Sequence, residues 1–295
     1  MKGQVAQEDP PFSVPNMQLL TLDHLKTHGF QTAYVVHPNG DLPYVVHNDR
    51  RVVLFEFLRG ESPSVDSVTL GMLEQLGGAL ASLHSLPAVH AVPSIDEGGC
   101  MMIGEAATEF EKELLAAGSE SLAGHPFVVQ LRQTLPRTRE LLHLGSVPHS
   151  VIHTDLFPDN SLFYEGRLQG IVDFEEVCRG PSLLDVAMTT IACCFRATPP
   201  GYQDTTVAED KVAAILRGYH AMRPFTAEER ALFGEYLTLA CLVISFWRFR
   251  NFNVRKAQQS SETDKAKYLE MQQRATFIRD WEAGGALKRH FESLV

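Results

Sequence analysis

Residues 151–187 read VIHTDLFPDNSLFYEGRLQGIVDFEEVCRGPSLLDVA, a stretch that contains the pattern H-x-D-x-x-x-x-N at His153, Asp155 and Asn160. An apolar run follows and ends in Asp173. Phosphoryl transfer requires one carboxylate that orients the attacking hydroxyl, together with hard oxygen ligands that hold magnesium against the phosphates. Each of these residues alone usually marks a turn or a strand end. Their order, on a strand–loop–strand support, predicts a phosphoryl-transfer site.

The elements around this stretch predict an α+β fold, because a few strands come first and mostly helices follow. Apolar spacing indicates the helices, and β-branched or aromatic runs indicate the strands. The expected helices cover residues 19–28, 70–84, 106–117, 127–144 and 232–247, the last after a capping box at 226–229, and the expected strands cover residues 33–37, 44–47, 52–57, 151–153 and 170–174. We expect a disordered tail over residues 1–16, a first lobe over 17–57 and a helical catalytic lobe over 58–295.

The composition of the 295-residue chain is that of a globular protein with an acidic surface. Hydrophobic residues make up 44% of the sequence, and the formal net charge is −10. This charge gains little from counterion release on nucleic acid and is not drawn to an anionic membrane, so we expect neither as a partner. No secretory signal is recognisable, and the apolar stretch 236–247 is too short to span a bilayer.

The cysteines indicate an intracellular protein. They are odd in number and lack CxxC spacing, so we expect them to be reduced and buried in the core. They are Cys100, Cys178, Cys193, Cys194 and Cys241. Together with the lack of a signal, this predicts a cytoplasmic location, while the oligomeric state is left open.

The 151–187 stretch resembles the catalytic core of the phosphotransferase superfamily that includes aminoglycoside and choline kinases. The chain is most similar to homoserine kinases of the non-GHMP class, through residues 154–160, Arg167-Leu168, FLRGES at 57–62 and LASLH at 80–84. The resemblance covers roughly residues 19–255 and implies a two-lobed, protein-kinase-like fold, with a reduced β-rich N-terminal lobe and a mainly helical C-terminal lobe. It also implies ATP and Mg²⁺ as cofactors and a small molecule with a hydroxyl group as acceptor.

The resemblance assigns roles to individual residues. It implies that Asp155 is the catalytic base and that Asn160 and Asp173 hold magnesium against the nucleotide. Asp185 would brace the catalytic loop by accepting its backbone N–H groups, and His153 would be structural and pack under the Asp173 turn. The connector between the lobes would contact adenine through backbone groups, at Leu54, Phe55, Glu56 and Phe57.

Two charged positions bear on the acceptor. The resemblance to homoserine kinases implies that Arg250 binds a substrate carboxylate. The alternative is that Arg250 is a solvated arginine in a basic cluster with Arg248 and Arg255. Glu175, with Glu176, would receive a substrate ammonium, and the alternative is a surface salt bridge. The two glutamates depart from the homoserine-kinase pattern, which tends to have aromatic residues there. We expect transfer to a primary hydroxyl of an amino alcohol or hydroxy amino acid, with homoserine as the first candidate.

The phosphate-binding elements of a kinase-like lobe are not recognisable before the first helix. A glycine-rich loop and a strand lysine are expected there, and Lys26, Arg50 and Arg51 are not convincing substitutes. We therefore expect a truncated N-terminal lobe, which would mean an incomplete sequence, an enzyme with unusual nucleotide contacts, or a pseudokinase that binds a ligand or protein without transfer. A metal hydrolase is a further alternative, built on His153, Asp155, Asp159 and Asp173.

Overall fold

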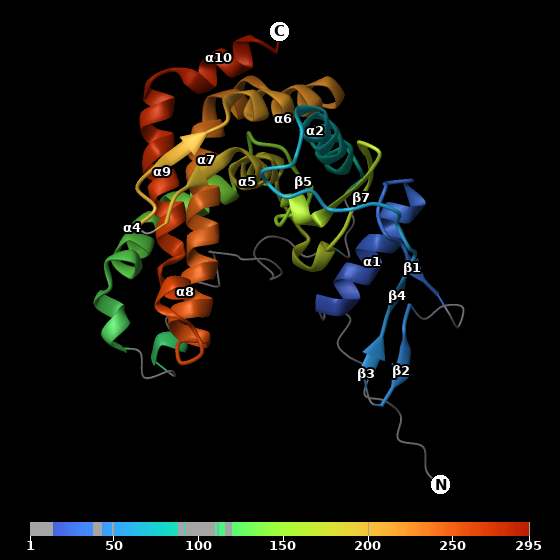
Figure 1. Cartoon of the computed structure of the whole chain (residues 1–295), viewed down its shortest axis with the longest axis horizontal. Helices are drawn as coiled ribbons and strands as arrows, with labels where there is room; N and C mark the ends of the chain where they lie inside the picture. The colour runs from blue at the N-terminus through green and yellow to red at the C-terminus, as the bar shows by residue number, and fades with distance from the viewer. Residues whose placement is uncertain are drawn as a thin grey trace.

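The computed structural model describes residues 14–37, 43–48, 50–87, 92, 110, 112–115, 120–199 and 201–294. The first helix and four short strands lie together on one side, and the helices of the second half of the chain form the opposite side (Figure 1). The first group comprises α1 (Val14–Thr27), β1 (Val35–Val36), β2 (Val45–His47), β3 (Arg50–Val52) and β4 (Leu54–Phe55). Cys100, most of the expected tail and most of the expected 106–117 helix lie outside the described residues.

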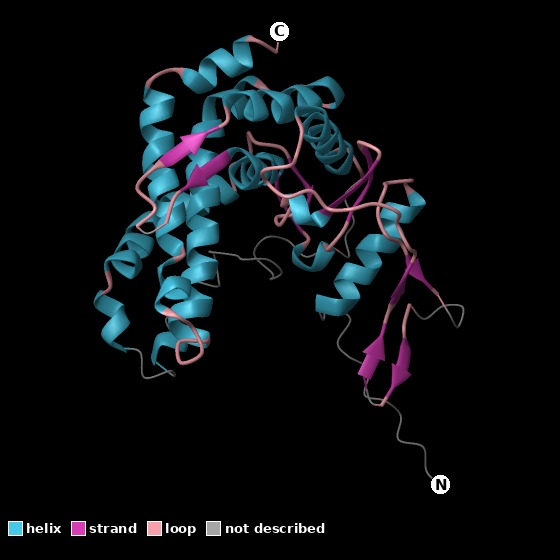
Figure 2. Cartoon of the chain, in the orientation of Figure 1, coloured by secondary structure: helices cyan, strands magenta, loops and turns pink. Residues whose placement is uncertain are grey.

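The rest of the chain is mainly helical (Figure 2). Its helices are α2 (Leu70–His84), α4 (Pro126–Leu142), α5 (Ser182–Cys194), α6 (Glu209–Met222), α7 (Ala227–Phe249), α8 (Glu262–Ala266), α9 (Tyr268–Ala283) and α10 (Ala286–Glu292). Its strands are β5 (His149–Ile152), β6 (Ser161–Tyr164), β7 (Arg167–Ile171), β8 (Cys178–Pro181), β9 (Phe195–Ala197) and β10 (Thr205–Val207). Short helical turns are η1 (Glu120–Gly124), η2 (Pro158–Asn160), η3 (Phe174–Glu176) and η4 (Arg250–Arg255).

The strands form two-stranded antiparallel sheets, of which two position the predicted site. β5 pairs with β8, with Ile152 opposite Cys178, and β6 pairs with β7, with Ser161 opposite Ile171. The loop 153–160 therefore begins and ends beside the turn 172–177. These two strand pairings bring the residues of the H-x-D pattern close to those that follow β7, although the two groups are separated in the sequence.

Two boundaries differ from the sequence prediction. Helix α1 begins at Val14, inside the expected tail, because Pro15 is tolerated in a first helical turn where its missing N–H is not needed. The expected strand 52–57 is broken, since β3 pairs with β2 whereas β4 pairs with β1. The chain changes its pairing partner at Val53.

Helix α7 extends beyond the predicted 232–247 at both ends, since it runs from Ala227 to Phe249. The capping box is confirmed: Thr226 caps the helix, and the Glu229 carboxylate reaches back to the Thr226 N–H. Among the described residues, the span Ala227–Arg255 is long and apolar enough to cross a membrane, so the expectation that this segment is too short is wrong. However, 67% of its most apolar window is buried inside the fold, as in a core helix.

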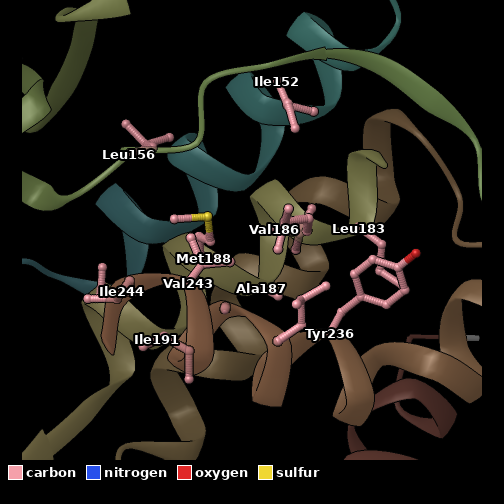
Figure 3. Packing of buried hydrophobic residues seen from close by; sticks show 14 of the residues in the cluster. Ile152, Leu156, Leu183, Val186, Ala187, Met188, Ile191, Tyr236, Val243 and Ile244 are labelled. Atoms are coloured by element: carbon pink, nitrogen blue, oxygen red, sulfur yellow. The ribbon is translucent and has the colours of Figure 1, made fainter. Parts of the chain in front are cut away.

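The core is centred on α5, whose thirteen residues are all buried. Figure 3 shows Leu183, Val186 and Met188 of α5 packed among side chains of α7, including Tyr236 and Val243. Ile152 and Leu156, at the start of the loop 153–160, belong to the same buried cluster and are labelled in Figure 3. The loop is thus fixed to the most buried part of the molecule.

Helices α2 and α6 cross with backbone against backbone. A Cβ atom added to Gly77 would lie 2.2 Å from the carbonyl oxygen of Ile215, and one added to Gly218 would lie 1.9 Å from that of Glu74. Only glycine permits so close an approach. The crossing holds His84 of α2 and Tyr219 of α6 side by side, with His84 Nδ1 2.8 Å from the Tyr219 hydroxyl.

Candidate active site

The loop between β5 and β6 folds back so that Asn160 holds Asp155. The Asn160 side-chain amide donates to the backbone oxygen of Asp155 at 2.7 Å and to its carboxylate at 3.2 Å. The Asn160 N–H donates to Phe157 O at 3.0 Å, which closes the loop. Because the amide nitrogen is used on Asp155, the amide oxygen of Asn160 is the atom left to bind a cation.

A fully buried carboxylate, Asp185 at the start of α5, lies beneath this loop. It accepts the backbone N–H of His153 at 2.7 Å and that of Thr154 at 2.8 Å, and His84 Nε2 lies 3.0 Å away. Burial alone would raise the pKa of Asp185, but the hydrogen bond from His84 and the contacts with His153 outweigh it and keep this pKa below its usual value. The ionised carboxylate makes the loop contacts that the sequence leads us to expect.

The loop that Asp185 holds contains a strained residue. Thr154 has a φ of +64°, a conformation that β-branched residues rarely adopt. Such a backbone costs about 1–3 kcal/mol, so surrounding contacts must impose it. The two hydrogen bonds of Asp185 do so from one side, and the Thr154 hydroxyl donates to Glu176 O at 2.9 Å on the other. Thr154 therefore links the catalytic loop to the turn after Asp173.

His153 has a structural place and no access to a ligand. Its Nδ1 accepts from the Asp155 N–H at 3.2 Å, so the proton is on Nε2, which donates to Val172 O at 2.9 Å. Burial lowers the pKa of the ring, which keeps it neutral. The ring packs edge-on against Phe174 with centroids 4.6 Å apart, under the Asp173 turn.

Asp173 stands at the end of β7 in a left-handed conformation, with φ 69° and ψ 60°. The preceding residue, Val172, donates its N–H to Asn160 O at 2.9 Å, so the two predicted magnesium ligands lie on hydrogen-bonded neighbouring segments. Phe174 is buried and anchors the turn, whereas the Asp173 side chain is exposed. A carboxylate and an amide oxygen at such a junction form the hard-oxygen donor set that magnesium prefers.

Asp155 is the carboxyl with the most unusual pKa in this region. Burial raises it, the charges of Asp173, Glu176 and Asp159 raise it further, and the hydrogen bond from Asn160 lowers it, which gives a pKa of about 7. A carboxylate with this pKa can accept a proton at neutral pH. A divalent cation beside it would lower the pKa again, because positive charge favours the ionised form.

Asp155 opens into a cavity of about 300 Å³, which we call the Asp155 cavity. Its lining comes from the catalytic loop, the turn after β7 and one face of α7, and comprises Asp155, Phe157, Asp173, Glu175, Glu176, Ile244, Trp247 and Arg248. The space suits a small acceptor rather than a macromolecule. Glu175 and Glu176 are thus beside the predicted base, as the hypothesis of an ammonium site requires.

The arginine of the Asp155 cavity is Arg248 and not Arg250. Ile244, Trp247 and Arg248 have the i, i+3, i+4 spacing of a single helix face, and Arg250 is two residues further on and points elsewhere. Arg250 donates from Nε and Nη2 to the carboxylate of Glu113, both at 2.7 Å, and Arg255 donates to the same carboxylate. The Arg250 hydrogen bonds lower the pKa of Glu113 to about 2. The structure therefore gives Arg250 a protein carboxylate as its partner.

A second cavity of about 510 Å³ lies between α1, the first strands and the turn after β7, and we call it the Phe55 cavity. It is lined by Gln18, Leu22, Thr32, Ala33, Val53, Phe55, Val172, Asp173, Phe174 and Glu175. Asp173 and Glu175 line both cavities. The two spaces are therefore separated by the residue that is predicted to hold the metal.

Of the four residues predicted to contact adenine, Phe55 lines the Phe55 cavity and the other three do not. The Glu56 N–H already donates to Tyr34 O at 2.8 Å, and its side chain pairs with Lys26 at 3.0 Å. Leu54 and Phe57 are 60% and 91% exposed. The Glu56 N–H is therefore already used within the protein and is not free for the expected contact with adenine.

The metal-hydrolase alternative has no geometric support in the part of the chain that the structure describes. No group of three or more His, Cys, Asp or Glu side chains there is arranged to hold a metal ion. His153 in particular has both ring nitrogens in hydrogen bonds with the backbone. Asn160 and Asp173 offer only two predicted oxygen ligands, which is fewer than a metal site built from protein side chains alone would have.

Comparison with solved structures defines the class of fold. The chain is similar to a choline kinase from Cryptosporidium parvum, with a TM-score of 0.60 and 13% identity over 95% of this chain and 82% of that one. It is also similar to an amicoumacin kinase solved with AMP-PNP and Ca²⁺, with a TM-score of 0.62 and 15% identity over 90% of this chain and 76% of that one. These likenesses confirm the predicted α+β, protein-kinase-like fold.

The sequence comparisons give the family. A family model described as the phosphotransferase enzyme family matches residues 17–225, more than half of the chain, and the chain belongs to this family. A homoserine kinase from Azorhizobium caulinodans is 31% identical over 226 residues, or 77% of this chain. The chain spans 64% of the length of that relative. The resemblance to aminoglycoside, choline and homoserine kinases is confirmed.

Proposed function

We propose that the chain transfers the γ-phosphoryl group of ATP to a primary hydroxyl of a small amino alcohol or hydroxy amino acid, with homoserine as the first candidate. The observation that carries this proposal is the hydrogen bond by which Asn160 holds Asp155, together with the position of Asp173, which follows the residue bonded to Asn160 O and lines both cavities. One cavity contains Asp155 and suits the acceptor, and the other contains Phe55 and suits the nucleotide. The matching family and the homoserine kinase relative support the same reaction.

The proposed chemistry assigns a role to each of the three residues. The acceptor hydroxyl donates a hydrogen bond to Asp155; its oxygen forms the new bond to the γ-phosphorus, the bond to the β-phosphate oxygen breaks, and the hydroxyl proton passes to Asp155. Asn160, through its amide oxygen, and Asp173 would hold Mg²⁺, which when bound neutralises charge on the phosphates. Asn160 also fixes Asp155, so it orients the base as well.

The nucleotide side of the proposal rests on the Phe55 cavity. Its apolar lining from Leu22, Ala33 and Val53 suits a flat base, and Asp173 at one end suits metal-bound phosphates. Among the described residues, no basic side chain lines the Phe55 cavity. Bound Mg²⁺ would therefore supply the positive charge that offsets the phosphates. We also propose a cytoplasmic location, where ATP is abundant. The four described cysteines are free and buried, as expected for a protein in a reducing compartment.

The test is a pair of substitutions, each assayed with ATP, Mg²⁺ and a panel of amino alcohols and hydroxy amino acids. Asp155→Asn should lower kcat by about 10²–10⁴-fold, the usual worth of general base catalysis. Glu165→Gln is the control, because Glu165 is an exposed acidic residue in the turn between β6 and β7 that lines neither cavity, and it should change kcat by no more than about threefold. An unchanged kcat in Asp155→Asn would remove the base assignment.

Metal dependence separates the kinase from its alternatives. Asp173→Asn should raise the Mg²⁺ concentration needed for half-maximal activity, and calorimetry should show weaker binding of Mg²⁺–ATP. A wild-type chain that binds Mg²⁺–ATP but yields no phosphorylated product from any acceptor would instead favour the pseudokinase.

A further inference from the structure

We propose an additional ligand site, distant from the catalytic loop, that binds a zwitterionic amino acid with an aliphatic side chain. The site is a cavity of about 340 Å³ between α4, α7 and α9, which we call the α9 cavity. No residue that lines it lines the Asp155 cavity or the Phe55 cavity. The inference is therefore independent of the proposed function.

The α9 cavity and the Asp155 cavity lie on opposite faces of α7, against which α4 and α9 both pack (Figure 1). Ile244 lines the Asp155 cavity, whereas Thr238, Leu239 and Leu242 line the α9 cavity. Because an α-helix has 3.6 residues per turn, Leu242 and Ile244 point in directions about 160° apart. A ligand in the α9 cavity is thus separated from the catalytic loop by the whole helix.

The floor of the α9 cavity is apolar. Leu141 of α4 and Leu239 of α7 are buried, and Leu242 of α7 is partly buried against the core. An aliphatic side chain placed on these leucines would be removed from water, which is the main favourable contribution to the binding of such a group. The volume of the cavity is in the range of small-molecule sites.

On the α4 side of the cavity the charges are already paired. Arg137 donates from Nε and Nη2 to Oε2 of Glu235 at 2.9 Å and 2.6 Å. Arg137 also pairs with Glu140 at 2.7 Å, so two carboxylates balance its charge. The second oxygen of Glu235, Oε1, accepts no hydrogen bond from any described residue. This oxygen is left for a donor on a ligand.

On the α9 side two opposite charges remain unpaired. Arg279 and Glu282 are three residues apart, a spacing at which a guanidinium and a carboxylate can pair on a helix surface. Neither makes an ion pair with any described residue, and Arg279 donates only to the Thr276 hydroxyl, at 3.2 Å. The Glu282 carboxylate instead lies against α7, in the space that a Cβ atom at Gly234 would occupy. Both charged groups are therefore available at the edge of the same cavity.

The arrangement of these charges matches a zwitterion. An ammonium group placed between Glu235 and Glu282 would offset the repulsion of the two carboxylates, which together with burial raises the pKa of Glu282. A carboxylate on the same ligand would pair with Arg279. A ligand with only one of these charges would leave either Arg279 or Glu282 without a partner. An α-amino acid has both groups on one carbon atom, and its side chain would lie on the apolar floor.

The experiment is isothermal titration calorimetry of the full chain, with L-leucine as the probe. We expect a Kd below about 1 mM for L-leucine, and binding of L-alanine that is weaker by about tenfold or more because most of the apolar side chain is missing. Two analogues of leucine remove one charge each: 4-methylpentanoate lacks the ammonium group, and 3-methylbutylamine lacks the carboxylate. Each should bind at least about fivefold more weakly than L-leucine, as expected for the loss of one charge-assisted contact.

Substitutions locate the ligand, after thermal unfolding has shown that each variant is folded. Glu282→Gln and Arg279→Gln should each raise the Kd of L-leucine at least about fivefold. Arg279→Gln should leave the Kd of 3-methylbutylamine within about twofold of the wild-type value, since this ligand has no carboxylate to lose a partner. Asp280→Asn is the control on the same helix, because Asp280 is exposed and does not line the α9 cavity, and it should not change the Kd of L-leucine.

A matched change in the Asp155 cavity distinguishes the two sites. Glu175→Gln should leave the Kd of L-leucine unchanged, because Glu175 lines the Asp155 and Phe55 cavities and not the α9 cavity. The α9 site is wrong if L-leucine does not bind to the wild-type chain, or if Glu175→Gln weakens its binding while Glu282→Gln does not. Neither result bears on the kinase proposal, whose test is the formation of a phosphorylated product.

Discussion

Replacement of Asp185 by alanine should destabilise the protein more than any change in the loop that Asp185 supports. The substitution removes the acceptor of three hydrogen bonds, from the His153 and Thr154 N–H groups and from His84. Each buried donor left without a partner costs about 1–3 kcal/mol. Allowing for a water molecule that reaches one of them, we expect a loss of about 4 kcal/mol, a large part of the 5–15 kcal/mol by which proteins are typically stable.

The assay is equilibrium urea unfolding, in which the midpoint should fall while the slope of the transition is unchanged. Amide hydrogen exchange should accelerate at His153 and Thr154. Asp185→Asn should lose at least half as much stability, because its NH₂ group would face a donor. Asp66→Ala is the control, since its 91% exposed side chain pairs with Arg196 and should contribute at most about 1 kcal/mol. A loss below about 1 kcal/mol in Asp185→Ala would show that the loop is held by other contacts.

Other regions give further predictions. Gly218→Ala should destabilise the protein by about 2–4 kcal/mol, because the new Cβ would overlap Glu74 O, whereas Gly71→Ala, with open space around it, should be neutral or stabilising in thermal unfolding. The pKa of Glu113 is lowered from 4.5 to about 2 on folding. Its contribution to stability is therefore complete above about pH 5 and is lost as the pH falls toward 2, and Glu113→Gln should remove this part of the acid dependence of unfolding. Arg250→Ala should leave the acceptor KM unchanged, and a raised KM would restore Arg250 as a substrate ligand.

The catalytic loop could be predicted because its residues are contiguous and its supports are strands. The spacing from His153 to Asn160 sets the loop length, and the apolar run before Asp173 sets the second strand. Neither depends on long-range packing. The capping box at Thr226 is predictable for the same reason, since both of its hydrogen bonds lie within three residues.

The identity of the arginine in the cavity could not be predicted in this way. Arg248 and Arg250 look alike in a basic segment until the phase of α7 relative to the core is known. The signal was present in the spacing of Ile244, Trp247 and Arg248, which places them on one helix face. What selects that face for the cavity is the packing of α7 on α5 and α9, which joins residues from distant parts of the chain.

The geometry of the site depends on the crossing of α2 and α6, which lies away from both the Asp155 cavity and the Phe55 cavity. At Gly77 and Gly218 the two helices touch through their main chains, so no side chain there can move aside. A larger residue at either position would therefore have to tilt a whole helix. A tilt of α2 would carry His84 with it and, through Asp185, the loop that bears Asp155. Damage at these glycines should therefore be detected first as a misplaced base in a protein that still folds.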